Sequence, residues 1–310
     1  MTARPADATP AVPVSEEQFA QVQPGVEICY QTFGSPDAEP LLLVMGLGGP
    51  MTWWNPDFCR ELADRGFFVI RYDNRDTGRS TKIGGRVRRA ALVRAFAGRG
   101  GPPPYTLSDL ADDAFGLLNT LGLEAAHVVG VSMGGMIVQT MAVERPERLR
   151  SMTSIMSTLG KRTVGWQHPK LLPLLLAPRG PGRAAYAETS ARMWQIIGSP
   201  AYPEPHTEVL RRAEETWDRG FSANGVMRQM LAILAQPDRT PQLRRLTLPV
   251  LVIHGLADKM VHVSGGRATA NAIPGSELLL VDGMGHDLPR ALYPSFADAI
   301  RRTADRAGGL

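Results

Sequence analysis

The stretch His127-Val128-Val129-Gly130-Val131-Ser132-Met133-Gly134-Gly135-Met136 decides the fold. Its apolar, β-branched beginning is typical of a buried strand, and the run that follows it is compatible with a helix. Between them stands Gly-x-Ser-x-Gly, the pattern of a nucleophile elbow, in which a sharp turn exposes a serine. Unless it is a plain turn, the stretch predicts that Ser132 is a nucleophile at a helix N-terminus, where backbone N–H groups stabilise a developing anion.

The composition excludes several classes of protein. The chain has 310 residues, of which 44% are hydrophobic and 21% charged, as is typical of a globular protein. Lys and Arg number 34 against 30 Asp and Glu, a balance too even to indicate nucleic-acid binding. Cys29 and Cys59 form no CxxC motif, which favours free thiols and a cytoplasmic protein. No run approaches the ~20 apolar residues of a membrane span, and the N-terminus lacks the apolar core of a signal peptide.

Strands alternate with helices in two separate parts of the chain, 17–156 and 248–310. The succession is clearest where the apolar run Leu41–Met45 is followed by a helical pattern at 56–65 and a second apolar run at 67–72. Such runs are typical of strands buried on both faces, and the succession of strand, helix and strand implies a parallel sheet. We therefore expect one α/β core with a mostly parallel, doubly wound sheet.

The alternation stops between residues 157 and 247. This segment has helical patterns near 168–177, 184–197, 205–219 and 224–235. We expect it to form a helical cap that is inserted into the core before the last two strands. Residues 1–16, which precede the first strand, are expected to be a disordered lead-in.

A serine hydroxyl needs a base to remove its proton and an acidic residue to orient that base. In doubly wound sheets the working side chains lie at the carboxyl ends of strands. Asp258 follows the strand expected at 249–254, and His286 follows the last strand, expected at 278–281. The chain order Ser132, Asp258, His286 matches the order expected of one hydrolase fold, so these residues are the predicted triad.

Other acids and histidines fit these roles less well. Asp73 lies at a strand end and is the strongest rival acid, although its loop is better suited to bracing the site. His127 precedes its strand and should lie at the opposite edge of the sheet, and His254 is expected to be structural. Three further histidines lie beside the Asp258 loop or in the expected cap: His262, His168 and His206.

Attack on a carbonyl creates an oxyanion, which needs two preorganised N–H donors. One donor is expected from the backbone of Met133, directly after the nucleophile. The other is expected from Leu47, whose flanking glycines let the loop approach the elbow. The sequence has no HExxH, no GxxxxGK[ST] and no GxGxxG that opens a strand–helix unit, so neither a metal nor a cofactor is expected.

Several motifs resemble those of the α/β-hydrolase fold family. They are Met45–Gly49, Arg71–Ser80, the Gly-x-Ser-x-Gly stretch and Gly285-His286. The resemblance covers roughly 25–156 and 247–305, and the first two motifs are similar to those of bacterial carboxylesterases of the aclacinomycin methylesterase type. It implies that Ser132 is the nucleophile, Asp258 the acid and His286 the base. The chain departs from many members in having Met rather than His before the first glycine of the first motif.

These features predict a serine hydrolase that cleaves a small-molecule carboxylic ester through an acyl-enzyme. The expected substrate is a methyl ester or lipophilic ester of a secondary metabolite or lipid. The alternative is a thioesterase that acts on acyl-CoA or carrier-bound acyl groups, and a perhydrolase would use the same triad. A non-catalytic ligand receptor on the same fold is the alternative from another class. Serine at position 132 argues against the epoxide-hydrolase and dehalogenase branches, which need a carboxylate nucleophile.

Two further features concern substrates and partners. Residues 79–99 contain seven basic residues and no acid. They form either a solvent-exposed segment without a partner or a patch that attracts an anionic substrate, a carrier domain or a lipid surface. Large apolar side chains of the cap predict an apolar substrate pocket, unless they serve ordinary packing. They are Trp166, Met193, Trp194, Met227 and Met230.

Overall fold

The computed structural model describes residues 11–171 and 182–309. In this part of the chain the core is an eight-stranded sheet in the order β1-β2-β4-β3-β5-β6-β7-β8. The strands are β1 Gln18–Gln23, β2 Val26–Phe33, β3 Glu39–Val44, β4 Phe67–Tyr72, β5 Ala126–Val131, β6 Leu149–Ile155, β7 Val250–Gly255 and β8 Glu277–Val281. β2 is antiparallel to both of its neighbours, and every other pairing is parallel. The predicted mostly parallel, doubly wound sheet is confirmed.

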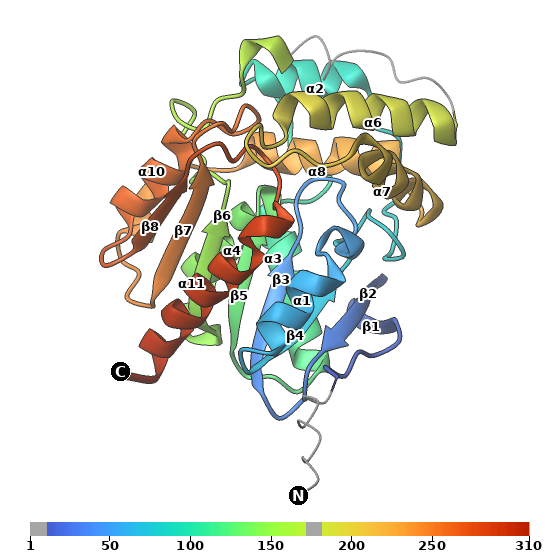
Figure 1. Cartoon of the computed structure of the whole chain (residues 1–310). Coiled ribbons are helices and arrows are strands. Elements are labelled where there is room, and N and C mark those ends of the chain that lie inside the picture. Colours follow the sequence, from blue (N-terminus) through green and yellow to red (C-terminus); the bar gives the residue numbers. More distant parts are fainter. Residues whose placement is uncertain (1–10, 172–181, 310) are drawn as a thin grey trace, which may run out of the picture.

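Helices cover both faces of the sheet (Figure 1). α1 (Pro56–Ala63) and α11 (Tyr293–Asp305) pack together on one face. α3 (Leu107–Thr120), α4 (Met133–Glu144) and α10 (Ser264–Ala272) cover the other. Each central strand therefore needs apolar side chains on both of its faces, which explains the continuous apolar runs in the sequence.

The strand β3 shows how the two faces are filled. Leu42 and Val44 belong to the apolar cluster beneath α3 and α4, whereas Leu41 and Leu43 belong to the cluster beneath α1 and α11. All four side chains are fully buried. Burial of this kind contributes about 1.5–3 kcal/mol for each large aliphatic side chain, and it fixes the position of β3 next to β5.

The helices begin where the sequence provides caps. Asn55 accepts a hydrogen bond from the backbone of Asp57 at the start of α1, with Pro56 in the first turn. At the start of α3, Thr106 and Asp109 form a reciprocal capping box. These side chains satisfy N–H groups that have no partner within the helix, and α1 begins at the predicted residue, Pro56.

The segment expected to form a cap lies over the carboxyl ends of the strands (Figure 1). It contains η3 Pro169–Leu171, α6 Arg183–Ile197, α7 His206–Asp218, α8 Ala223–Ala235 and α9 Thr240–Leu243. The helices predicted near 184–197, 205–219 and 224–235 are present. The rest of the helix predicted near 168–177 lies outside the described residues, and the short α9 was not predicted.

The N-terminal part of the chain is described only from residue 11, so most of the expected lead-in, 1–16, lies outside the described residues. Within it, Val14 forms an antiparallel bridge with Phe33. No helix in the described ranges is long and apolar enough to cross a membrane.

Two buried ion pairs join the cap helices to the loop that follows β4. Arg219, at the end of α7, contacts Asp73 at 2.8 Å and Glu17 at 2.6 Å. Arg228, on α8, contacts Asp76 at 2.7 Å. Removing Arg228 would cost about 3–5 kcal/mol because Asp76 would stay buried without a counterion, whereas Arg219 keeps Glu17 when Asp73 is removed. These pairs hold the cap at a fixed position above the sheet.

Candidate active site

The turn between β5 and α4 holds Ser132 in a strained conformation. Its backbone has φ 56° and ψ −116°, a region that side chains with a Cβ rarely adopt. A Cβ on Gly130 would lie 2.1 Å from the carbonyl oxygen of Gly134, and a Cβ on Gly134 would lie 2.0 Å from that of Val44. Only glycine fits at either position. The turn therefore has the predicted form, with the serine between strand and helix.

Ser132, His286 and Asp258 lie together at the carboxyl ends of the strands. His286 Nε2 is 3.0 Å from Ser132 Oγ, and His286 Nδ1 is 2.8 Å from Asp258 Oδ2. Both distances are those of hydrogen bonds. When Nδ1 carries the proton donated to Asp258, Nε2 is free to accept the serine proton. The three residues are 154 and 28 positions apart along the chain, so the fold alone brings them together.

The carboxylate of Asp258 is buried and ionised. Its second oxygen, Oδ1, accepts hydrogen bonds from the backbone N–H groups of Met260 at 2.8 Å and Val261 at 2.9 Å. Burial by itself raises the pKa of Asp258, but the neighbouring His286 and His254 outweigh burial and hold the pKa at about 2. Asp258 therefore carries a negative charge at neutral pH and stabilises an imidazolium at His286.

The loop that carries His286 is held by the end of α6. The backbone N–H of His286 donates to the carbonyl of Ile197 at 2.7 Å. The next residue along the loop, Asp287, accepts a hydrogen bond from Ser199, whose oxygen also accepts one from the backbone of Gly285 at 2.8 Å. The expected cap thus positions the predicted base. Nothing in the sequence pattern singles out Ser199, since a serine after a helix is common in loops.

The loop with Leu47 lies beside the elbow and lines the same cavity as Ser132. The backbone N–H groups of Leu47 and Met133 make no hydrogen bond to another protein group within the described residues. Free N–H groups next to a serine nucleophile are what an oxyanion requires. Neither of the two donors predicted from the sequence is thus occupied by another described protein group.

Side chains from two other elements fix this loop. Asn74 donates a hydrogen bond of 3.0 Å to the carbonyl oxygen of Met45, and Gln229 of α8 accepts one of 2.8 Å from the backbone of Gly48. Gln229 also donates to Thr77 at 2.9 Å. Hydrogen bonds with Asn74 and Gln229 therefore hold the loop without one from the side chain of Met45. Gln229 could not be found in the sequence because it looks like any polar residue on a helix.

The rival acid takes a different position. Asp73 accepts hydrogen bonds from the backbone of Met51 at 2.7 Å and of Arg79 at 2.8 Å, in addition to its ion pair with Arg219. No histidine is among its partners in the described ranges. Asp73 braces the loops that surround the site, as its position in the sequence suggested.

The other histidines lie away from Ser132 or have partners of their own. His127 contacts Ser151 at 2.8 Å at the far edge of the sheet, and burial lowers its pKa to about 4. His254 is fully buried and contacts the carbonyl of Val261 at 2.8 Å. The remaining three are on the surface or in the cap segment: His168, His206 and His262.

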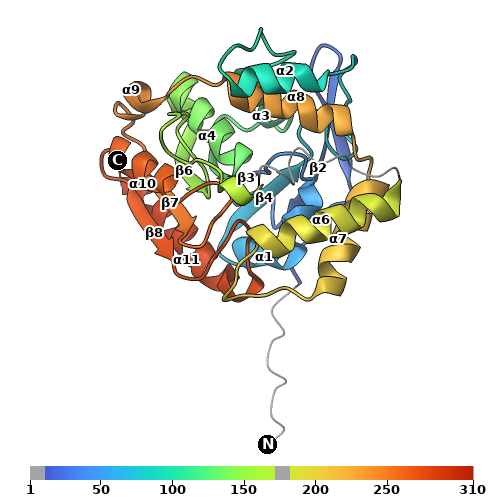
Figure 2. The ribbon, with the colours of Figure 1, turned by 90° about the horizontal axis from the view of Figure 1, so that it is seen from above.

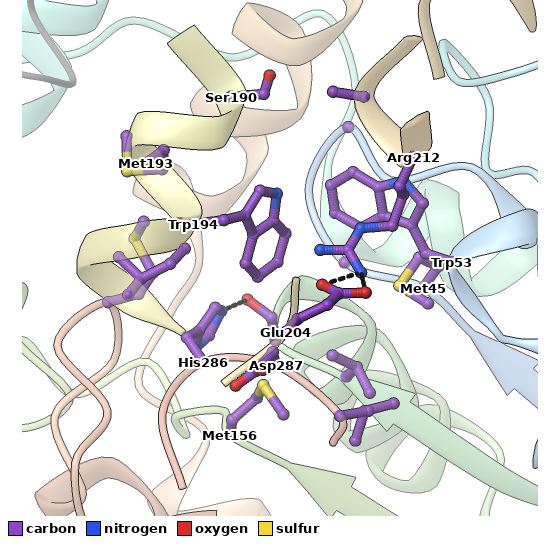
Figure 3. A pocket seen from close by; sticks show the side chains of 18 of the residues that line it. Met45, Trp53, Met156, Ser190, Met193, Trp194, Glu204, Arg212, His286 and Asp287 are labelled. Atoms are coloured by element: carbon purple, nitrogen blue, oxygen red, sulfur yellow. Dashed lines mark hydrogen bonds and ion pairs between the residues drawn. The ribbon is translucent and has the colours of Figure 1, made fainter. Parts of the chain in front are cut away.

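A cavity of about 1130 Å³ opens above Ser132 and His286, beneath the cap helices. Its lining includes three of the side chains predicted from the sequence, Met193, Trp194 and Met230. Figure 3 shows His286 and Trp194 facing the same space. The cavity is large enough for a bulky, mostly apolar molecule whose reacting group reaches the serine.

Two of the side chains predicted to line the pocket do not. Trp166 is 46% exposed and stacks against His262, with ring centroids 4.2 Å apart. Met227 lies on another side of α8, where it lines a separate cavity against residues 86–89. The structure therefore places Trp166 and Met227 outside the cavity above Ser132, because composition cannot tell which face of a cap element meets the core.

An aromatic wall borders the cavity, in which Trp194 was predicted from the sequence and Trp53 and Arg212 were not. Trp53 meets Trp194 edge-on, with ring centroids 5.4 Å apart, and the guanidinium of Arg212 lies 5.0 Å from the Trp194 ring. Arg212 also pairs with Glu204 at 2.7 Å (Figure 3). The position of Trp53 just after the Leu47 loop could have indicated its role. Arg212 gave no such signal, because charged residues on a helix usually face solvent.

The chain belongs to the α/β hydrolase fold family, whose sequence model matches residues 39–289. It is 31% identical over 299 residues to the rhodomycin D methylesterase DauP of Streptomyces sp. (strain C5), covering 89% of this chain and 94% of that protein. It is 29% identical over 260 residues to 3-oxoadipate enol-lactonase 2 of Acinetobacter baylyi, covering 83% and 85%. These relatives confirm the resemblance to methylesterases and the prediction of a carboxylic ester hydrolase.

Solved structures give the same fold. The enol-lactonase of Burkholderia xenovorans LB400 matches with a TM-score of 0.70 and 24% sequence identity, covering 94% of this chain and all of that one. A hydrolase of Pseudomonas aeruginosa matches with a TM-score of 0.67 and 23% identity, covering 95% and 98%. At these identities the similarity supports the architecture of the sheet and its helices.

Proposed function

We propose that Ser132, His286 and Asp258 are the catalytic triad of this ester hydrolase. The observation that carries the proposal is the unbroken chain of hydrogen bonds from Asp258 through His286 to Ser132, which ends at the floor of a large cavity. The strained backbone of Ser132 adds to it, because strain of this kind is found mainly at functional sites.

In the first half of the reaction, Ser132 Oγ attacks the carbonyl carbon of the ester while its proton passes to His286 Nε2. The carbonyl oxygen becomes an oxyanion, which accepts hydrogen bonds from the N–H groups of Leu47 and Met133. The bond to the alcohol oxygen then breaks, and the alcohol takes the proton from His286. The acyl group stays on Ser132 as an ester.

In the second half, water attacks the acyl carbon and gives a proton to His286. The bond to Ser132 Oγ breaks, the serine recovers its proton from His286, and the carboxylic acid leaves. Ionised Asp258 stabilises the imidazolium in both halves. Only Ser132 and His286 change their protonation among the protein groups, while the two backbone N–H groups donate hydrogen bonds and keep their protons.

For the substrate, we propose a small-molecule ester with a bulky, mostly apolar acyl part and a small alcohol. The cavity supports a large acyl group because methionine and tryptophan side chains dominate its surroundings near Ser132, among them Met45, Met156, Met193 and Trp194. Cleavage of a methyl ester, the activity in the name of DauP, fits this arrangement. The expected cap, 157–247, would then supply the wall that selects the acyl group.

The test is a panel of methyl, p-nitrophenyl and acyl-CoA esters with wild type and Ser132→Ala. We expect the substitution to lower kcat by a factor on the order of 10⁴ or more, and a fluorophosphonate probe to label only the wild type. Equal hydrolysis by both proteins would refute the triad. Faster turnover of the thioesters than of the oxygen esters would replace the ester proposal by the thioesterase alternative.

We propose that the reaction takes place in the cytoplasm. Cys29 and Cys59 are both free thiols, as is usual for proteins of a reducing compartment.

The two cysteines are also buried, and burial raises the pKa of each thiol to about 12. Protonated, buried thiols react slowly, so these residues take no part in the proposed chemistry. Labelling of the folded protein with a thiol reagent should therefore be much slower than labelling after denaturation.

A further inference from the structure

The basic segment after β4 carries charges that the proposed reaction does not use. No acidic residue occurs between Asp76 and Asp109. Five arginines of this segment are exposed, and none of them forms an ion pair with any described residue. They are Arg86, Arg88, Arg89, Arg94 and Arg99. Five unpaired positive charges with no acid between them form a local excess of charge, which attracts a partner of negative charge.

The helix within this segment, α2 (Arg89–Phe96), also exposes apolar side chains. Val93 is 60% exposed and Phe96 is 44% exposed, whereas Ala95 is buried. At about 100° per residue, Val93 lies at the centre of the outward face, with Phe96 and Arg89 on one flank and Arg94 on the other. We call α2 together with the five arginines the α2 surface.

The α2 surface lies on the outer side of α8, a helix of the expected cap. α2 lies along α8 in both views (Figures 1 and 2). Arg228 of α8 donates a hydrogen bond of 2.6 Å to the carbonyl of Gly85, and Asn224 accepts one of 3.4 Å from the backbone of Val87. The segment is therefore attached to a helix whose own position is fixed by the buried pair with Asp76.

A second cavity, of about 750 Å³, lies between this segment and α8. Three of the five arginines line it, together with Asn224 and Met227. Val226 and Met230, on another side of α8, line the catalytic cavity. One helix thus separates a basic cavity from the space above Ser132.

We propose that the α2 surface docks on an anionic lipid bilayer. Val93 and Phe96 enter the interfacial region, and the arginines contact lipid phosphates, some of them within the cavity against α8. A helix with an apolar centre and basic flanks binds such a surface through apolar burial and charge together. Docking places the cap on the bilayer and leaves the catalytic cavity one helix away, where it can receive lipophilic molecules from the membrane.

The experiment is cosedimentation of the full-length protein with sucrose-loaded vesicles. One set contains phosphatidylcholine alone, and the other is an equimolar mixture of phosphatidylcholine and phosphatidylglycerol. Each arginine near an anionic surface contributes about a fivefold increase in partitioning. We expect wild type to pellet with the anionic vesicles only, and Arg88→Gln/Arg89→Gln/Arg94→Gln to partition about 100-fold less. Binding of the wild type should weaken as salt is raised.

A matched variant tests whether position rather than net charge matters. Arg244, Arg245 and Arg302 are exposed, lie outside the α2 surface and form no ion pair among the described residues. Arg244→Gln/Arg245→Gln/Arg302→Gln should therefore bind the vesicles as wild type does. Val93→Ser/Phe96→Ser should weaken binding without changing net charge. Hydrolysis of a soluble p-nitrophenyl ester, equal in all four proteins, shows that each is folded.

The possible outcomes separate the alternatives. Equal loss of binding in the two triple variants would overturn the proposal, because net charge alone would then explain it. A wild type that stays in the supernatant with anionic vesicles at low salt would overturn it too, and retention on an immobilised acidic carrier protein would then identify a protein partner instead. Neither result depends on the triad, since binding is measured without turnover.

Discussion

The backbone of Ser132 stores strain that a substitution can release. Strained non-glycine residues cost of order 1–3 kcal/mol, whereas replacing a residue by glycine costs about 0.4–1 kcal/mol through the freedom of the unfolded chain. We therefore expect Ser132→Gly to be more stable than Ser132→Ala by about 1 kcal/mol, with both proteins inactive. Urea unfolding of the two variants measures the difference. An equal or lower stability for the glycine variant would mean that the turn is not strained.

Asp258 and Asp73 are both buried carboxylates at strand ends. Substitution of Asp258 should lower activity, whereas substitution of Asp73 should lower stability. Asp258→Asn removes the charge that orients His286, so we expect kcat to fall by about 10⁴-fold. Asp73→Asn leaves Arg219 and two backbone donors poorly satisfied, so it should cost about 1–3 kcal/mol of stability and leave kcat of the folded enzyme within about threefold of wild type. Kinetics corrected for active-site titration separate the two effects. The reverse pattern would assign the catalytic acid to Asp73.

The low pKa of Asp258 predicts how the free energy of unfolding depends on pH. Its value in the folded protein, about 2, lies below the ordinary value of 3.8. Ionised Asp258 therefore stabilises the folded state above about pH 4, and this contribution, roughly 2 kcal/mol, is lost as the pH falls toward 2. The free energy of unfolding of wild type should drop over this interval more steeply than that of Asp258→Asn. Parallel curves for the two proteins would contradict the assignment.

At the scale of the elements, α6 should select the acyl group through Trp194. This side chain forms the aromatic wall with Trp53 and Arg212 beside the catalytic cavity. Trp194→Ala should lower kcat/KM for esters with bulky aromatic acyl groups by about 10-fold or more and change that for acetyl esters little. Trp166→Ala is the matched control, because Trp166 is exposed outside this cavity. Equal losses on acetyl and bulky esters would point to a general disturbance of the cap.

The residue ranges of the strands and helices were largely predictable from the sequence. The segments and cavities that their side chains contact were not. Apolar runs and capping residues determined the strands and most helices, since these signals are local. Which face of a cap helix meets the site depends on contacts between distant segments. Met227 and Met230 differ by only about 60° around α8, yet Met230 lines the catalytic cavity and Met227 the other one. No pattern within α8 could distinguish them.

The sequence could place Ser132, Asp258 and His286 together for a related reason. The glycines around Ser132 and the strand ends before Asp258 and His286 are requirements of one local turn and of one edge of a sheet. The residues that hold these groups in place, such as Ser199 and Gln229, act through contacts between the cap and the core. Serine and glutamine are common polar residues, so only the three-dimensional structure reveals the role of these two.

At the scale of the whole molecule, the cap and the core should unfold as one unit. Arg228 of α8 and Asp76 of the β4 loop are buried against each other, and Tyr105 adds a hydrogen bond of 2.7 Å to the same carboxylate. Arg228→Met leaves that carboxylate without its counterion, so we expect a loss of about 3–5 kcal/mol. Asp76→Asn/Arg228→Met, which removes both charges, should recover part of it.

The control is an ion pair that lies within the cap. Arg183 and Asp218 join α6 to α7 at 2.8 Å, but both side chains are exposed. Solvent screens such a pair strongly, so Arg183→Met should change the free energy of unfolding far less than Arg228→Met. Tryptophan fluorescence reports on the cap alone in Trp53→Phe/Trp54→Phe, whose remaining tryptophans, Trp166, Trp194 and Trp217, all lie within 157–247. Urea unfolding of this protein followed by fluorescence and by far-ultraviolet circular dichroism, which reports on the whole chain, should give coincident transitions. If the fluorescence transition came first, the cap would be an independent unit, and the buried pair would not couple it to the core.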